Sequence, residues 1–244
     1  MGTAFLTELR LLSRNPQLVV SLVLLPVLFV GLLSEAAAPI WPTSNPYQST
    51  IPAYTIMFAF YGGAFASEAF FRERMWGNWP RLLSLPVSRW SVSAGKLLAT
   101  TSVVLAIQLL LFGLGAVVLD IRLGNVASLV LVLAVTSVAA TSLGPFLAGV
   151  ADSQLTIDQI SNVLVLGLAG LGGAIVPSER LPEVLQPLVP LTPQYWALKG
   201  ITEATGGASP LELLPVFLAL GAFTLVAYGG AAFTFRWSRM TESV

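Results

Sequence analysis

Long runs without a charged residue dominate the chain, and short polar segments separate them. A membrane-spanning helix needs about 20 apolar residues. The runs that reach this length cover 15–34, 36–67, 97–119, 123–151, 159–178 and 213–235. Within them we expect six transmembrane helices, near 17–33, 52–71, 97–119, 127–149, 159–176 and 212–234. The pattern predicts an all-α, polytopic membrane protein in which residues 1–244 form a single transmembrane domain.

The start of the chain predicts a helix over 1–16 that lies in the membrane interface. Three apolar residues share one face of this helix and two cations lie off it: Phe5, Leu9 and Leu12 against Arg10 and Arg14. The run that follows, with three alanines at 36–38, resembles a secretory signal. We expect it to be a retained first span.

Lysine and arginine positions predict the orientation. Six crossings place both termini on one side, and nine of the twelve basic residues then fall on that side: Arg10, Arg14, Arg72, Arg74, Arg81, Arg89, Lys96, Arg236 and Arg239. The other side holds Arg122, Arg180 and Lys199. The positive-inside rule therefore places both termini in the cytoplasm, with the protein in the plasma membrane. The segment 152–158 should be a short cytoplasmic loop, although it has no basic residue.

Composition removes several function classes. Hydrophobic residues make up 55% of the chain and charged residues 10%, against roughly 25% charged in a soluble domain. The net charge is zero, so we expect no nucleic-acid partner. The sequence has no cysteine and no histidine, which excludes thiolate sites and serine–histidine catalysis. We therefore expect neither a catalytic site nor a metal site.

The cytoplasmic segment 72–96 is the most informative polar part. Pro80 favours a helix start and Pro86 a helix end, which predicts a short helix of about two turns between them. Trp79, Leu82, Leu83 and Pro86 share one face of it. Ser88 is a suitable cap for the helix that follows. The alternative is an ordinary interfacial loop whose arginines meet anionic lipid head groups.

These residues resemble a motif of the type-2 permease class of ABC exporters. Arg72-Glu73-Arg74, the run from Leu82 to Arg89 and Gly95-Lys96 match the family pattern, whereas Asn78 stands where threonine is usual. The resemblance implies an exporter permease that works with a separate ABC ATPase and a second permease subunit, identical or related. ATP and Mg would be bound by the ATPase, because this chain has no Gly-x-x-x-x-Gly-Lys-[Ser/Thr] phosphate loop. No cofactor is expected on this chain.

The same resemblance implies that the short loop helix is the coupling helix that docks on the ATPase. Its residues are Trp79, Arg81, Leu82, Leu83, Pro86, Val87, Ser88 and Arg89. Beside it we expect a polar network of Glu68, Arg72, Glu73 and Arg74. Arg72 lies four residues after Glu68, so a helical ion pair is expected. For Glu68 the alternative is an interfacial carboxylate already reached by water.

In the family the substrate path is lined by the second and fifth spans. The residues that fit this role are Phe58, Tyr61, Phe65, Gly167 and Gly170, and plain helix packing is the alternative for each. Six prolines within 177–211 predict short re-entrant helices in the outer leaflet, or else an external loop.

The function expected is outward transport of an apolar or amphipathic substrate. Two other functions stay open, namely an ion-coupled secondary transporter and a membrane scaffold without transport activity. The absence of charged residues other than Glu68 from the expected spans argues against the first.

Overall fold

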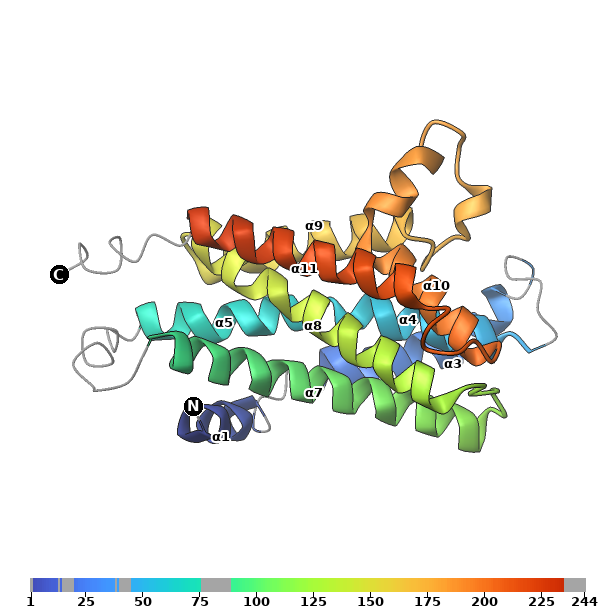
Figure 1. Cartoon of the computed structure of the whole chain (residues 1–244), viewed down its shortest axis with the longest axis horizontal. Coiled ribbons are helices and arrows are strands. Elements are labelled where there is room, and N and C mark those ends of the chain that lie inside the picture. The colour runs from blue at the N-terminus through green and yellow to red at the C-terminus, as the bar shows by residue number, and fades with distance from the viewer. Residues whose placement is uncertain are drawn as a thin grey trace.

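The computed structural model describes residues 2–12, 14, 20–37, 39, 45–75 and 89–234. Every regular element in that part of the chain is a helix, which confirms the all-α prediction. The main helices are α1 (Gly2–Leu12), α3 (Leu25–Ala37), α4 (Tyr47–Ala59), α5 (Gly62–Met75), α7 (Arg89–Val118), α8 (Val126–Val150), α9 (Gln154–Leu171), α10 (Pro193–Thr205) and α11 (Leu214–Thr234). The long helices run along the longest axis of the molecule (Figure 1).

Four helices among the described residues are long and apolar enough to cross a membrane: Val92–Val118 of α7, α8, α9 and α11. The first expected span is a short π-helix, Val20–Leu24, followed by α3, which is apolar but shorter. The six-span count therefore stays a prediction. α1 and the C-terminal end of α11 lie at the same end of the bundle (Figure 1), as an even number of crossings requires.

The second expected span is two helices, which corrects the prediction of one continuous helix over 52–71. α4 ends at Ala59 and α5 begins at Gly62. Between them the backbone tightens, because the Tyr61 amide donates to the Phe58 carbonyl and the Gly63 amide to the Phe60 carbonyl. Two successive glycines favour a break here, since glycine is a poor helix former. A Cβ atom on Gly63 would also lie 2.8 Å from the Ala140 carbonyl oxygen.

The fifth span begins five residues earlier than expected. Ser153 caps α9, since its hydroxyl accepts a hydrogen bond from the Thr156 amide at 3.1 Å. The helix ends before Gly172 and Gly173, and Gly173 has a φ of 89° that favours glycine. The prediction of a loop over 152–158 was therefore wrong for 154–158. Asp158 lies within a helix.

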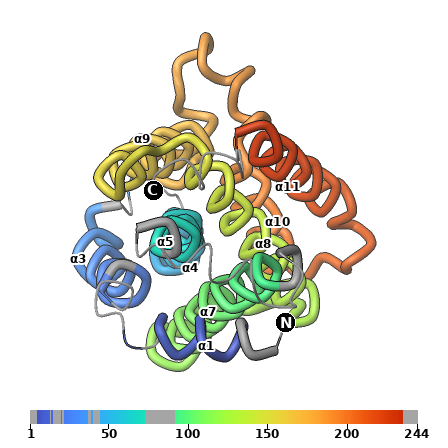
Figure 2. The backbone as a smooth tube through the Cα atoms, turned by 90° about the vertical axis from the view of Figure 1, so that its left-hand side faces the viewer, coloured from blue at the N-terminus to red at the C-terminus, as the bar shows by residue number. Residues whose placement is uncertain are grey.

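α8 is the most buried of the four helices that are long enough to cross a membrane. Of its most apolar stretch 61% is buried, against 22–28% for the other three candidate spans. α5 and α11 pack on it, and Figure 2 shows it among the other helices. The contact with α5 is close because Gly144 faces Ala66, where an added Cβ would collide with the Ala66 side chain. Small residues take this role in membrane proteins, where tight packing drives helix association.

The segment 177–211 contains short helices, as the prolines predicted: Ser178–Arg180 and Gln186–Leu191, both 3₁₀, and α10. α10 is half-buried against α8, α4 and α11, whereas the part before it projects away from the bundle (Figure 1). The Asn125 amide donates to the Ala204 carbonyl at 2.9 Å, which joins the end of α10 to the start of α8. Entry of this segment into the membrane stays a prediction.

The α5–α8 contact can be tested with Gly144→Val. The added side chain would overpack this interface and lower the free energy of unfolding by about 1–3 kcal/mol. For a chain of this length the thermal midpoint in detergent should fall by roughly 2–10 °C. Gly221→Val is the control, because none of the residues placed in the structure lies within 4 Å of a Cβ at that position, its own helix aside. Equal midpoints for the two variants would contradict the close approach.

Candidate functional site

A buried carboxylate anchors α1 to the bundle. Phe5, Leu9 and Leu12 pack on one apolar cluster, together with residues of α5 and α7, and Arg10 and Arg14 are exposed. This arrangement confirms the expected apolar face. The same face also carries Glu8, which is only 3% exposed. A charge in such a place needs a partner.

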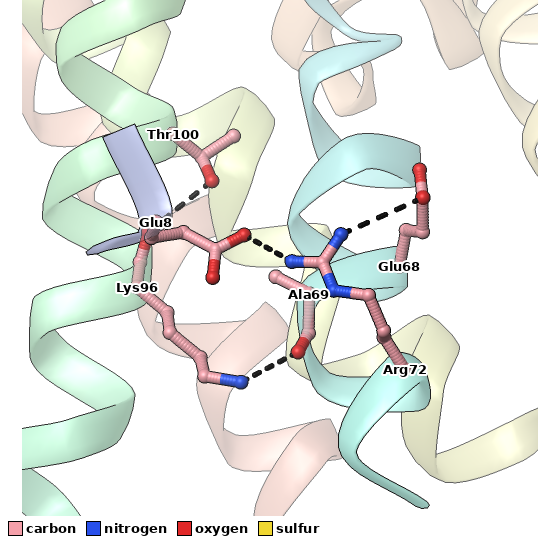
Figure 3. A network of polar contacts seen from close by, with 6 residues as sticks. All are labelled: Glu8, Glu68, Ala69, Arg72, Lys96 and Thr100. Atoms are coloured by element: carbon pink, nitrogen blue, oxygen red, sulfur yellow. Dashed lines mark hydrogen bonds and ion pairs between the residues drawn. The ribbon is translucent and has the colours of Figure 1, made fainter. Parts of the chain in front are cut away.

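The partner of Glu8 is Arg72 on α5. One guanidinium nitrogen of Arg72 lies 2.6 Å from Glu8 Oε1, and the other lies 3.7 Å from Glu68 Oε1 (Figure 3). The predicted Glu68–Arg72 ion pair is therefore present, but it is the longer of the two. The exposed fraction of the side chain rises from 4% for Glu8 to 16% for Arg72 and 31% for Glu68. Arg72 thus links the surface helix to the second expected span.

Lys96 makes a second link, between α7 and α5. Its side chain is buried, and its ammonium group donates a hydrogen bond of 2.6 Å to the Ala69 carbonyl (Figure 3). The ammonium group also lies 5.7 Å from the centre of the Phe70 ring. Arg72 and Lys96 therefore connect α1, α5 and α7 at one end of the bundle.

A polar cavity lies between α5 and α9. Its volume is about 280 Å³, and it is lined by Tyr61, Ala64, Phe65, Glu68, Gln154, Asp158, Ser161 and Asn162. The lining positions recur every three or four residues on each helix, so each helix presents one face to the cavity. The arrangement brings the carboxylates of Glu68 and Asp158 to the same space.

The predicted substrate-path residues divide into three groups. Tyr61 and Phe65 line the cavity. Phe58 is buried in the main core and stacks on Tyr61 with ring centres 6.0 Å apart. Gly167 and Gly170 lie further along α9, where no described residue of another helix comes within 4 Å of an added Cβ. These two glycines therefore do not support helix packing within this chain.

The predicted coupling residues fall almost entirely outside the described residues: Trp79, Arg81, Leu82, Leu83, Pro86, Val87 and Ser88. Arg89 is the first residue of α7, and Glu73 and Arg74 belong to α5, but the described side chains do not include these three. The segment 76–88 lies between α5 and α7 in the chain.

A comparison with known families decides what kind of protein carries this site. The family model described as "ABC-2 type transporter" matches residues 2–205. The chain belongs to the ABC-2 type transporter family. This match confirms the resemblance to the type-2 permease class that the 72–96 motif suggested.

Two relatives of this permease are known by name. One is the inner membrane transport permease YhhJ of Escherichia coli (strain K12), which is 28% identical over 182 residues, or 72% of this chain and 47% of that protein. The other is the linearmycin resistance permease protein LnrN of Bacillus subtilis (strain 168), 24% identical over 185 residues, or 74% of this chain and 47% of that protein. The chain thus spans about half the length of both relatives.

Several residues of the permease's site were not predicted from the sequence, among them Glu8, Lys96 and Asp158. The burial of Glu8 could have been predicted, because Glu8 lies three residues after Phe5 and four before Leu12, on the apolar face of a helix. Lys96 was assigned only to the family motif and to the count of cytoplasmic charges. Asp158 was placed in a loop, because the cap at Ser153 was not recognised. Among the described residues no three potential ligands of the His, Cys, Asp or Glu type converge as a metal site would require.

The Arg72 link can be tested with a cysteine reporter, because the chain has no native cysteine. Leu12→Cys places a thiol on the buried face of α1, where Leu12 is 3% exposed. Adding Arg72→Gln leaves Glu8 buried without its ion pair, a change that costs about 3 kcal/mol or more. α1 should therefore detach more often, and maleimide labelling of the thiol should be at least about tenfold faster.

Arg122→Gln in the same Leu12→Cys background is the control, because Arg122 lies exposed before α8. Labelling at the same rate with and without the Arg72→Gln change would show that the ion pair does not hold α1 in place.

Proposed function

We propose that this permease is the membrane-spanning subunit of an ABC exporter. It moves an apolar or amphipathic substrate outward, using ATP and Mg bound by a separate ATPase. Family membership supports this proposal, and so does a relative that is named for linearmycin resistance. The protein functions in the plasma membrane, with both termini in the cytoplasm.

The observation that supports coupling best is the way in which the helices beside 76–88 are connected. α5 ends at Met75 and α7 begins at Arg89, so a force on the intervening segment acts on both helices. Lys96 ties α7 to α5, and Arg72 ties α5 to α1. Because α5 also lines the cavity, docking of the ATPase on 79–89 would shift one wall of that cavity.

A second permease subunit, identical or related, would complete the translocation path. Tyr61 and Phe65 are the residues of the expected path that the cavity supports directly. Membrane lipid is the remaining partner. We expect the chain to be inactive as an enzyme, because hydrolysis takes place on the ATPase.

An ion-coupled carrier is the rival function, and the placement of Asp158 strengthens it. Glu68 and Asp158 are two ionisable groups on apolar helices that line one space. Paired carboxylates of this kind bind ions in secondary transporters. ATP dependence separates the two functions, because an ion-coupled carrier would purify without an ATPase.

The proposal can be tested by gentle purification from the native membrane. A phosphate-loop ATPase should co-purify in stoichiometric amount and should be lost with Leu83→Asp, which places a charge on the docking face. Val184→Asp makes the same change at an exposed site in the projecting segment, and it should keep the ATPase. Arg89→Glu should leave the chain folded but abolish ATP-driven transport.

Recovery of the chain without an ATPase, under conditions that preserve other membrane complexes, would refute the exporter assignment. Normal transport by both Leu83→Asp and Arg89→Glu would refute the coupling-helix assignment alone.

A further inference from the structure

We infer that an apolar groove between α3, α4 and α7 holds one acyl chain of a zwitterionic phospholipid, and that Arg122 at the end of the groove binds the phosphate of its head group. Assignment to the outer leaflet rests on the proposed function, which places both termini in the cytoplasm. Three features support the inference: the lining of the groove, a glycine that keeps it open, and the charges at its rim.

The groove has a volume of about 290 Å³. α3 and α7 both pack on α4 but have little contact with each other. Tyr47, Ile51 and Thr55 follow one another every four residues, so one face of α4 forms the floor. All other lining residues are apolar or glycine. An engineered apolar cavity of roughly 150 Å³, about half this volume, stays dry and binds benzene. An apolar occupant is therefore favoured over water.

The edges of the groove are exposed apolar side chains, namely Val27 on α3 and Leu114 and Val118 on α7. α7 is long and apolar enough to cross a membrane, so these side chains meet either acyl chains or another subunit. The expected translocation path, which a second subunit would complete, follows the cavity between α5 and α9. Figure 2 shows α9 and α7 on different sides of α4 and α5. Lipid is therefore the occupant that fits the groove.

Gly31 keeps one wall of the groove open. It lines the groove, and no residue that the structure describes outside its own helix lies within 4 Å of a Cβ placed there. Gly115 on the other wall differs, because an added Cβ would lie 2.6 Å from the Ile51 side chain. Packing thus requires a glycine at 115 but not at 31. A larger side chain at 31 would fill the groove without disturbing the contacts between helices.

Packing, rather than the hydrophobic effect, favours a filled groove. An acyl chain that moves from the bilayer into the groove leaves one apolar environment for another. An empty groove, however, leaves its lining atoms without van der Waals contacts on one side. This gain is similar for any acyl chain. The choice among lipids must therefore depend on the head group.

The loop after α7 places Arg122 at the rim of the groove. Gln48, which follows the lining residue Tyr47, donates its side-chain amide to the Arg122 carbonyl at 3.0 Å and accepts from the Arg122 amide at 2.8 Å. The side chain of Asn45 donates to the carbonyl of Leu119, another lining residue, at 3.1 Å. These bonds fix the backbone of the loop beside the first turn of α4, and the Arg122 side chain is exposed.

The charges at this rim match a zwitterionic head group. The candidate span of α7 ends at Val118, at the end of the bundle opposite α1 (Figure 1), so Arg122 lies at the depth of the head groups. Within the described residues Arg122 forms no ion pair, and a guanidinium group binds phosphate oxygens well. Asp120, two residues earlier, is also exposed. Phosphatidylethanolamine offers a phosphate to the first and an ammonium group to the second.

Native mass spectrometry of the whole chain, purified in a mild detergent and freed of lipid, tests this inference. The probe is dioleoyl phosphatidylethanolamine, and one molecule should bind saturably to each chain. Dioleoylglycerol, which has the same chains but no phosphate, and dioleoyl phosphatidylglycerol, which has no ammonium group, should both bind more weakly. Gly31→Leu should weaken binding of the phosphatidylethanolamine at least about tenfold, because the added side chain occupies the groove.

Gly113→Leu is the matched control for Gly31→Leu. It adds the same side chain at an exposed glycine of a membrane helix, where no described residue outside that helix lies within 4 Å of a Cβ, but Gly113 does not line the groove. This variant should bind phosphatidylethanolamine like the unchanged chain.

Arg122→Gln should weaken binding of phosphatidylethanolamine about fivefold and leave binding of dioleoylglycerol unchanged. The bonds to Gln48 should persist, because they involve only the backbone of Arg122. Arg14→Gln is the control, since Arg14 is an exposed arginine next to α1, and it should change neither affinity.

Equal binding of phosphatidylethanolamine by Gly31→Leu and Gly113→Leu would overturn the groove as the site. Equal affinity of the unchanged chain for all three lipids would overturn the head-group contact. The same spectra count the chains, and a dimer that dissociates only in Gly31→Leu, without loss of lipid, would assign the groove to a second copy. Each of these results would leave co-purification of an ATPase, and hence the exporter function, intact. Selective lipid binding by a chain that never recovers an ATPase would keep the groove and reject the exporter.

Discussion

A guanidinium group among apolar helices must find its partners within the protein, and Arg72 finds them on two helices. In lipid there is little hydrophobic force between helices, so packing and polar contacts hold them together. The Arg72–Glu8 pair fixes the surface helix α1 to α5, and the Lys96–Ala69 hydrogen bond fixes α5 to α7. The helices on both sides of the segment 76–88 therefore belong to one connected unit.

This connection also shapes the cavity. Because Arg72 is held mainly by Glu8, it only partly neutralises Glu68, and Asp158 faces the same space from α9. The break between α4 and α5 places Tyr61 at the cavity wall, where it stacks on the buried Phe58. A link that holds the helices together thus also affects the charge around this cavity.

The candidate site was predictable where its signal lies within one helix. The spacing of Glu68 and Arg72 predicts their ion pair, and the family motif identifies 72–96 as a distinctive segment. For Glu8 the sequence allows only half of the prediction. Its position on an apolar face indicates that the carboxylate needs a partner, but it does not identify that partner. The pairing with Arg72 joins residues 64 positions apart, a separation that helical periodicity does not address. Asp158 was missed for a local reason, since the Ser153 cap extends α9 by more than one turn.

By itself, the sequence determined the class of this protein. Charge-free runs of membrane-spanning length and the lack of cysteine and histidine indicate a helical membrane protein without common catalytic chemistry, and the motif around 72–96 indicates the family. These properties depend on composition or on short stretches of sequence. They can therefore be recognised without knowing which helices pack together. Only the tertiary structure decided that α8 is the most buried of the long spans, that Gly144 rather than Gly167 permits close packing, and that Glu68, Asp158 and Ser161 line one cavity. Those properties depend on which helix faces meet, and that choice depends on long-range packing and on the pairing of buried charges.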